Sequence, residues 1–159
     1  MRVADWMSSP VHVVKPLDSA AHAREVLEKH RINQLPVVVD GKVVGIVTDR
    51  DLRDAFPSVI ELARPRHRRA ADAPENITVE QVMTPGVRTI APHDTVEEAI
   101  QVMRKERFGA LPVLEQGRLV GILARSDVLG AALALAATVK QLRGEVAPRN
   151  ASDEIRRNW

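Results

Sequence analysis

The residues whose types and spacing best suit binding chemistry lie in the segment Gly45-Ile-Val-Thr-Asp-Arg-Asp51. An apolar run ends there, and a helix is expected to begin near Thr48. The first N–H groups of a helix lack partners and carry the positive end of its dipole, so they favour an anion such as phosphate. The Thr48 hydroxyl and the Arg50 guanidinium would add donors to that anion. The Asp51 carboxylate suits a ribose diol, because it accepts hydrogen bonds from both hydroxyls.

Thr48 and Asp51 also fit a helix cap. A threonine at the N-cap position accepts a hydrogen bond from the backbone three residues on, and an acidic side chain at that position bonds back to the cap. On residue types alone, both interpretations stay open, and one threonine can serve in both.

This segment belongs to a unit that the chain contains twice. Residues 3–51 align without a gap with residues 79–127, at a constant offset of 76 positions. Identical residues at that offset include Val3 and Val79, Met7 and Met83, Val11 and Val87, Pro16 and Pro92, Asp18 and Asp94, Leu35-Pro-Val37 and Leu111-Pro-Val113, Val44-Gly-Ile46 and Val120-Gly-Ile122, and Asp51 and Asp127. A repeat of this size usually means that one unit cannot bury its apolar face without its copy. We therefore expect the functional site in a cleft between the two halves.

Each copy is predicted to form a β-α-β-β-α unit after a short helical turn such as Val3–Met7. Capping residues open the first helix of each copy, and a two-residue turn with glycine joins the next two strands. In the first copy the predicted elements are a strand at His12–Val14, a helix over residues 19–30, strands at Leu35–Val39 and Val43–Val47, and a helix from Thr48. In the second copy they are a strand at Val87–Ile90, a helix over residues 95–106, strands at Leu111–Leu114 and Leu119–Leu123, and a helix over residues 126–142.

The predicted division of the chain follows these elements. The first repeat covers residues 1–57, a linker with a basic segment covers 58–78, the second repeat covers 79–142, and a C-terminal tail covers 143–159. Prolines and charged residues replace the apolar periodicity in the linker and the tail.

The composition is that of a folded chain that can bury a core. The chain has 159 residues, of which 45% are hydrophobic and 28% charged. A net charge of +2 gives little support for nucleic-acid binding unless the positive residues cluster. The chain has no cysteine, which excludes disulfides and thiolate chemistry. The N-terminus lacks the features of a signal peptide, and the longest apolar run, Val128–Val139, is too short to cross a bilayer, so a cytoplasmic location without a membrane is expected.

Two tandem units, each with a leading Met-x-x-x-Val element, a Leu-Pro-Val strand and a Gly-Ile-x-x-x-x-Asp ending, resemble a pair of cystathionine β-synthase (CBS) domains. The resemblance covers roughly residues 3–57 and 79–140. It implies an α/β (α+β) fold in which both repeats pack about a pseudo-twofold axis into one module, and modules of this kind commonly form homodimers. It also implies a regulatory sensor that binds AMP, ADP or ATP in its cleft, sometimes S-adenosylmethionine or a dinucleotide. Such a sensor needs no obligatory cofactor and acts on a partner protein, here unidentified, instead of catalysing a reaction.

The resemblance further implies which residues surround the ligand. The family pattern Gly-x-x-Thr-x-x-Asp is complete in the first copy, where Thr48 would face phosphate and Asp51 the ribose, with Arg50 beside them. Around the first site it adds Ser8, Val11, Val13, Gln34, Leu35 and Pro36. Around the second it gives Thr84, Val87, Thr89, Ala110, Leu111 and Pro112, with Arg125, Ser126 and Asp127. Core packing is the alternative for Val11, Leu35, Val87 and Leu111.

The second copy departs from the pattern, because Ala124 stands where the first copy has Thr48. Ser126 would then cap the helix, and Arg125 would reach a phosphate. We therefore expect one better site centred on Thr48 and Asp51, and a second site that is weaker, different in ligand or empty.

The run Arg64-Pro-Arg-His-Arg-Arg69 is the only dense positive cluster and supports a second hypothesis, a nucleic-acid-associated protein. A solvated linker is the alternative, and the scarcity of aromatic residues argues against single-strand binding. The five histidines are not spaced as metal ligands, and no catalytic set can be argued from spacing, so neither a metal site nor an enzyme is expected. The Ala/Leu-rich helix over Val128–Leu142 is apolar on more than one face, which indicates either a dimer interface or internal packing.

Overall fold

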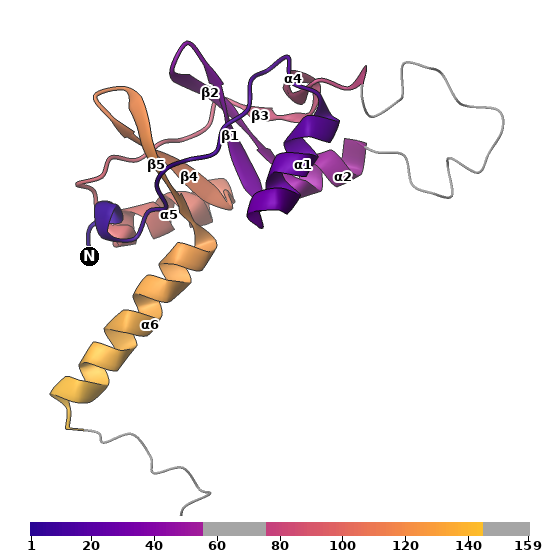
Figure 1. The fold of residues 1–159 in the computed structure, drawn as a ribbon. Coiled ribbons are helices and arrows are strands. Elements are labelled where there is room, and N and C mark those ends of the chain that lie inside the picture. The colour runs from indigo at the N-terminus through magenta and orange to yellow at the C-terminus, as the bar shows by residue number, and fades with distance from the viewer. Residues whose placement is uncertain (56–75, 145–159) are drawn as a thin grey trace, which may run out of the picture.

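The computed structural model describes residues 1–55 and 76–144, which form two small antiparallel sheets with helices beside them (Figure 1). The elements of the first repeat are η1 (Val3–Asp5), α1 (Ala20–His30), β1 (Gln34–Val39), β2 (Lys42–Thr48) and α2 (Asp49–Ala55). The elements of the second repeat are α4 (Val79–Val82), β3 (Thr84–Pro85), α5 (Val96–Glu106), β4 (Ala110–Glu115), β5 (Arg118–Ala124) and α6 (Arg125–Leu142). The predicted mixed fold of helices and strands in two repeats is confirmed.

The two hairpins form where the sequence predicts them. Asp40 and Gly41 join β1 to β2 with φ angles of 48° and 79°, and Gln116 and Gly117 join β4 to β5 with 49° and 78°. Positive φ at both central residues gives a turn whose twist matches that of the flanking strands. These turns fix the register, so the strand residues on the buried face of one repeat have equivalents in the other.

The helix caps follow the sequence equally closely. Ser19 accepts a hydrogen bond from the His22 N–H at 3.1 Å and opens α1. Thr95 and Glu98 form a reciprocal capping box at the start of α5, with bonds of 2.8 and 3.2 Å. Among the described residues, no helix is both long and apolar enough to cross a membrane.

The predicted strands at His12–Val14 and Val87–Ile90 are wrong, since each range contributes only one bridge residue. In the first repeat Val14 alone pairs, in parallel with Val37, and the second repeat repeats this arrangement. The chain before Val14 does not extend this pairing, because it lies on the other sheet: Ser8 exchanges hydrogen bonds of 2.9 and 3.1 Å with β5. The chain between is crossing from one repeat to the other.

The N-terminal turns of the two repeats are exchanged. The Val3 N–H donates to the Asp94 carbonyl of the second repeat at 2.9 Å, and the Val79 N–H donates to the Asp18 carbonyl of the first repeat, also at 2.9 Å. Figure 1 shows the N-terminal turn beside the β4–β5 half and α4 beside α1. Val3 and Val79, like Asp18 and Asp94, are equivalent positions at the offset of 76 residues. The two hydrogen bonds are therefore equivalent under the pseudo-twofold relation.

Each exchanged turn completes the other repeat's core. Val3 is buried in one cluster with Leu111, and Val79 is buried in a second cluster with Leu35. Burying one such side chain contributes about 1.5–3 kcal/mol. Within the described ranges no polar or charged residue is buried, so both cores depend on aliphatic packing.

Two glycines allow the exchanged segments to approach the sheets. A Cβ at Gly45 would lie 2.7 Å from Met83 Sδ and 2.9 Å from the Thr84 carbonyl oxygen. A Cβ at Gly121 would collide with the side chain of Met7, the equivalent contact in the other half. At Gly45 the Thr84 backbone leaves no room for a Cβ, whereas at Gly121 the side chain of Met7 would have to move.

We expect Gly45→Ala to lower the free energy of unfolding by about 1–3 kcal/mol, because the Thr84 backbone must move to admit the methyl group. Gly130→Ala in α6 is the matched control: its Cβ would meet the Trp6 ring at an ordinary 3.6 Å, and alanine favours a helix by about 1 kcal/mol. Urea unfolding of both variants makes the comparison. An unchanged midpoint in Gly45→Ala would contradict the close packing of β3 on β2.

Candidate functional site

A cavity of about 470 Å³ lies between the two repeats. It is lined by residues 7–12, by residues 30–34 at the junction of α1 and β1, and by Ile122, Ala124, Ser126 and Asp127 at the junction of β5 and α6. Its volume lies within the range of small-molecule sites, about 300–1,000 Å³. It is named the Asp127 cleft below.

The backbone fixes these three segments to one another. Ser8 and Ile122 exchange N–H···O bonds, which joins the crossing segment to β5. At the start of α6, the Arg125 N–H donates to the Gly109 carbonyl at 3.1 Å. Arg31 ends α1 in the left-handed conformation, with φ at 52°, and turns the chain into β1. The cleft therefore exists because the first N-terminal segment lies on the second sheet.

The structure groups the predicted site residues differently from the sequence. The sequence places Ser8, Val11 and Gln34 beside the Thr48–Asp51 pair of their own repeat, but these three line the cleft together with Asp127 of the other repeat. The physical reason is the exchange of the N-terminal segments, which carries residues 7–12 across to β5. By the repeat relation, Thr84 lies beside β2, where it pairs with Ile46.

The other predicted residues do not line this cleft. Leu35, Pro36, Ala110, Leu111 and Pro112 are buried in β1 and β4. Leu35 and Leu111 belong to the two cores, as the core interpretation predicts. Val13, Arg50, Thr84, Thr89 and Arg125 are exposed, and Val87 is half-buried. The Arg125 side chain donates instead to the Arg107 carbonyl, with Nη2 at 3.5 Å.

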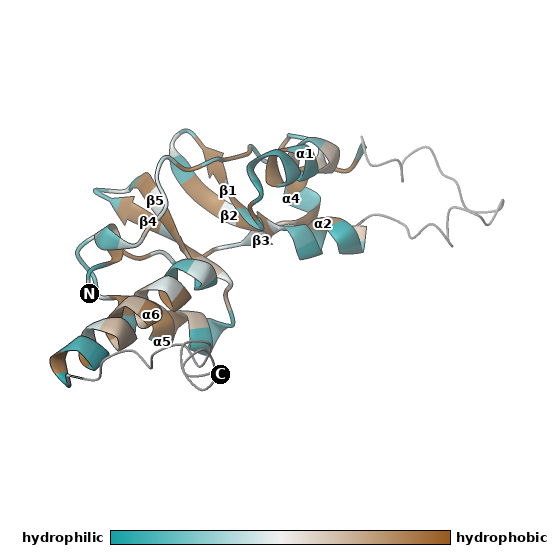
Figure 2. Ribbon diagram, turned by 60° about the horizontal axis from the view of Figure 1, so that its bottom comes forward, coloured by the Kyte–Doolittle hydropathy of each residue, from teal (hydrophilic) through white to brown (hydrophobic). Residues whose placement is uncertain are grey.

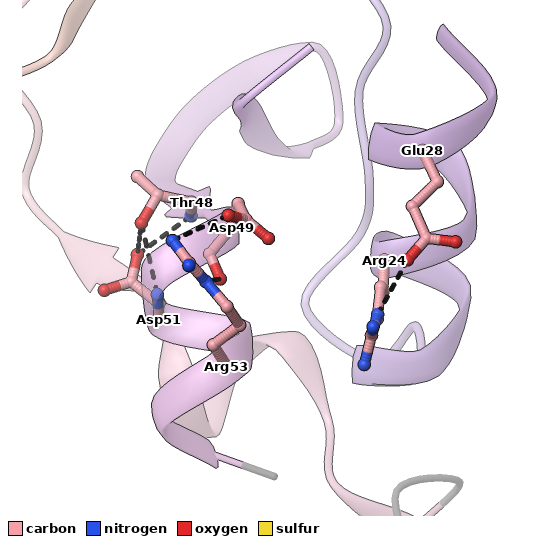
Figure 3. Close-up of polar contacts among 6 residues, drawn as sticks. All are labelled: Arg24, Glu28, Thr48, Asp49, Asp51 and Arg53. Carbon is pink, nitrogen blue, oxygen red and sulfur yellow. Dashed lines mark hydrogen bonds and ion pairs between the residues drawn. The ribbon is translucent and has the colours of Figure 1, made fainter. Parts of the chain in front are cut away.

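Thr48 and Asp51 form a complete capping box at the start of α2 (Figure 3). Asp51 Oδ2 accepts from the Thr48 N–H at 2.8 Å and from the Thr48 hydroxyl at 2.6 Å. The Asp51 N–H donates to Thr48 Oγ1 at 3.2 Å. The hydroxyl is thus engaged as donor and acceptor, in agreement with the cap interpretation. All bonds to the carboxylate use Oδ2, so Oδ1 is the oxygen that would meet a ligand.

The equivalent arrangement at the start of α6 has only half of this box. Asp127 Oδ2 accepts from the Ala124 N–H at 2.7 Å, but Ala124 has no side-chain acceptor to return the bond. The first-turn N–H groups at Ser126 and Asp127 therefore have no side-chain cap, and both residues line the cleft. Uncapped N–H groups at a helix start favour an anion. Because Ala124 provides no side-chain cap, the N–H groups at the N-terminus of α6 are available to a ligand.

The cationic wall of the cleft is not evident from the sequence alone. The rings of His12 and His30 are stacked, with centroids 3.6 Å apart and planes 23° apart, and Arg31 lies beside them. Desolvation lowers the pKa of the His30 imidazole below its ordinary value, and the positive charges of His12 and Lys29 lower it further. The internal repeat gives one indication of this wall, because the offset of 76 aligns Arg31 with Arg107 and both residues have positive φ.

Two further predictions from the sequence concern metal binding and the basic segment. In residues 1–55 and 76–144 no three histidine or carboxylate side chains are grouped to hold a metal ion. The basic run Arg64–Arg69 lies outside the described residues.

Comparison with known proteins identifies the repeats. The family model of the CBS domain matches residues 3–58 and again residues 79–134. Inosine-5'-monophosphate dehydrogenase of Korarchaeum cryptofilum is 33% identical over 128 residues, which are 80% of this chain and 23% of that protein. The CBS domain-containing protein YhcV of Bacillus subtilis is 30% identical over 126 residues, 79% of this chain and 81% of that protein. The chain therefore spans only a minor part of the dehydrogenase and most of YhcV.

Solved structures of CBS-domain pairs share the fold. CBSX2 of Arabidopsis thaliana in complex with AMP has a TM-score of 0.68 and 32% identity, covering 85% of this chain and 98% of that one. The CBS pair of protein MJ0100, in complex with 5'-methylthioadenosine and S-adenosyl-L-methionine, has a TM-score of 0.69 and 29% identity, covering 84% and 97%.

We expect Thr48→Ala to lower the free energy of unfolding by about 0.5–2 kcal/mol, because it removes the hydroxyl half of the capping box. The reverse change, Ala124→Thr, supplies that hydroxyl to α6 and is expected to stabilise the fold. Urea denaturation followed by circular dichroism measures both. A Thr48→Ala midpoint equal to that of the unaltered chain would mean that this cap contributes nothing to stability.

Proposed function

The chain belongs to the CBS domain family, and we propose that it is a regulatory module that holds an adenine nucleotide (AMP, ADP or ATP) between its two repeats. The observation that carries the proposal is the Asp127 cleft, whose walls come from both repeats and combine a carboxylate, uncapped helix N–H groups and cationic side chains. Relatives support it, since the CBSX2 structure contains AMP and the MJ0100 structure contains two adenosine compounds.

Each part of a nucleotide has a matching wall in this cleft. Asp127 bonds the backbone through Oδ2, so its Oδ1 is available to accept from the ribose hydroxyls. The half-buried side chains of Val11, Ile32 and Ile122 give an apolar slot of the kind that adenine requires. The start of α6 and the Arg31 guanidinium provide the positive potential that a phosphate requires.

We propose the Asp127 cleft as the principal site, in place of the Thr48–Asp51 centre that the sequence favours. The Thr48 hydroxyl is already hydrogen-bonded in the cap of α2, whereas no side chain caps the start of α6 and competes with a ligand for its N–H groups. A second ligand position at Thr48, Arg50 and Asp51 of the first repeat stays a prediction, with Thr84 and Val87 as the equivalents of Ser8 and Val11.

The output of such a module is inferred to be a change in its affinity for a partner protein. A ligand that touches both repeats stabilises one relative arrangement over others, and only this difference in affinity can shift the equilibrium. The proposal contains no catalytic step and no obligatory cofactor.

The module is further proposed to form a homodimer through α6. Figure 1 shows this helix extending away from the sheets, and Figure 2 shows its apolar colouring. Leu129, Leu133 and Leu142 are 65%, 73% and 82% exposed. Leu129 and Leu133 lie one turn apart on one face of α6, and Leu142 lies on the opposite face, so apolar side chains are exposed on more than one face. Exposed apolar surface of this kind normally marks an interaction site. In a dimer with twofold symmetry, α6 of one copy would pack against α6 of the other and bury the apolar side chains of both.

Calorimetric titration with AMP, ADP, ATP, NAD and S-adenosylmethionine tests the ligand. We expect Asp127→Asn to weaken binding by at least about tenfold, because the amide keeps an acceptor for the Ala124 N–H but loses the charge that strengthens bonds to the ribose. Asp94→Asn is the control, since that carboxylate accepts from the Ala91 N–H at 2.8 Å outside the cleft. No heat with any of the five compounds would refute the proposal. Binding lost only in Asp51→Asn would move the site to the other repeat.

Sedimentation equilibrium tests the dimer. The chain is expected at twice its mass of 17.6 kDa, and Leu133→Lys is expected at the monomer mass, because the lysine must lose its hydration in the interface. Leu17→Lys is the matched control, since Leu17 is 77% exposed but lies far from α6 in the chain. A dimer that survives Leu133→Lys, or a monomer in the unaltered chain, would refute the interface.

A further inference from the structure

Two histidines from different segments meet on one wall of the Asp127 cleft. His12 belongs to the crossing segment, and His30 is the last residue of α1. Their ring centroids are 3.6 Å apart, and Arg31 follows on the same wall. A cavity wall therefore carries two imidazoles and one guanidinium, of which the guanidinium is a fixed positive charge.

The stack opposes full protonation in the absence of a ligand. Two positive charges this close repel each other. Desolvation, and then the charges of His12 and Lys29, lower the pKa of His30. The other charged lining residues are Arg31, which adds to the repulsion, and Asp127 across the cleft. The free protein therefore disfavours the protonated form of His30.

The repeat relation retains positive charge at two of these three positions. At the offset of 76, Arg88 stands in place of His12 and Arg107 in place of Arg31, whereas Glu106 stands in place of His30. Arg31 and Arg107 have φ angles of 52° and 59°, in a region where glycine or asparagine is the less strained choice. Both repeats thus place a cation at this strained position.

The dipole of α1 offers a simpler account, because cations are stabilised at the C-terminus of any helix. That account applies equally to Lys29, which precedes His30 but does not line the cleft. The two accounts therefore predict different effects for Lys29 and for Arg31.

We propose that His12, His30 and Arg31 form an anion subsite that binds a phosphate group of the nucleotide and takes up one proton with it. The inference rests on the proposed function and adds a regulation of the same site. A bound anion stabilises the imidazolium, so the complex holds more protons than the free protein and ligand. Affinity therefore rises as pH falls from about 8 to about 6, by at most about tenfold per pH unit for one linked proton.

Calorimetric titration with AMP at about pH 8 and about pH 6.5, in buffers of different ionisation enthalpy, tests this inference. We expect tighter binding at the lower pH, by about three- to tenfold, and net proton uptake that approaches one. The phosphate of AMP has its own pKa near about 6, so the comparison that matters is with a variant under identical conditions.

His12→Gln/His30→Gln is that variant, and it is expected to bind AMP more weakly, with the extra pH dependence and the proton uptake lost. His12→Gln alone provides a second variant if the double change impairs folding. His93→Gln is the control, because His93 is 76% exposed and lies outside the cleft lining. Arg31→Gln is expected to weaken binding by about tenfold at both pH values, while Lys29→Gln changes it by less than about twofold.

Each of the following results would overturn the inference. AMP binding without proton uptake, or pH dependence that persists in the histidine variants, would refute it and leave the proposed function standing. Equal effects of Lys29→Gln and Arg31→Gln would assign the charges to the helix dipole. Absence of binding to the unaltered chain by AMP, ADP and ATP alike would refute both the inference and the proposed function.

Discussion

Val3 of the first repeat is buried in the second core, and Val79 of the second repeat is buried in the first core. The rest of the structure depends on this exchange. A two-stranded hairpin such as β1–β2 or β4–β5 is only marginally stable alone, and the turn that the other repeat supplies adds to the apolar surface that each repeat buries. The chain that carries the first turn must cross between the repeats, and residues 7–12 of that crossing become a wall of the Asp127 cleft. The cleft is thus a consequence of how the cores close.

The same pseudo-symmetry that builds two equivalent backbones leaves their side chains free to differ. Thr48 completes a cap at α2, while Ala124 leaves the start of α6 uncapped. His12 in one half corresponds to Arg88 in the other. Two positions related by the fold are therefore chemically distinct. They can differ in which ligand they bind, or one can bind a ligand while the other stays empty.

Local interactions made much of the fold predictable from the sequence. The turn at Asp40-Gly41 and the capping box at Thr95 and Glu98 depend on residues within a few positions of one another, and both occur as predicted. The internal repeat likewise predicted two related halves, which the two matches to the family model bear out. A ligand site between them stays a prediction. The site's grouping was not predictable, because Ser8 and Asp127 meet only through the exchange of segments that lie far apart in the chain. The stack of His12 on His30 follows no sequence pattern either, since it depends on where α1 ends relative to the crossing chain.

A crystal structure of the protein with AMP would show whether both repeats build one nucleotide site around Asp127. We expect a nucleotide bordered by residues 8–12 of the first repeat and by Ser126 and Asp127 of the second, with the ribose on the Asp127 carboxylate. A nucleotide held at Thr48 and Asp51 with the Asp127 cleft empty, or contacts confined to a single repeat, would contradict this expectation.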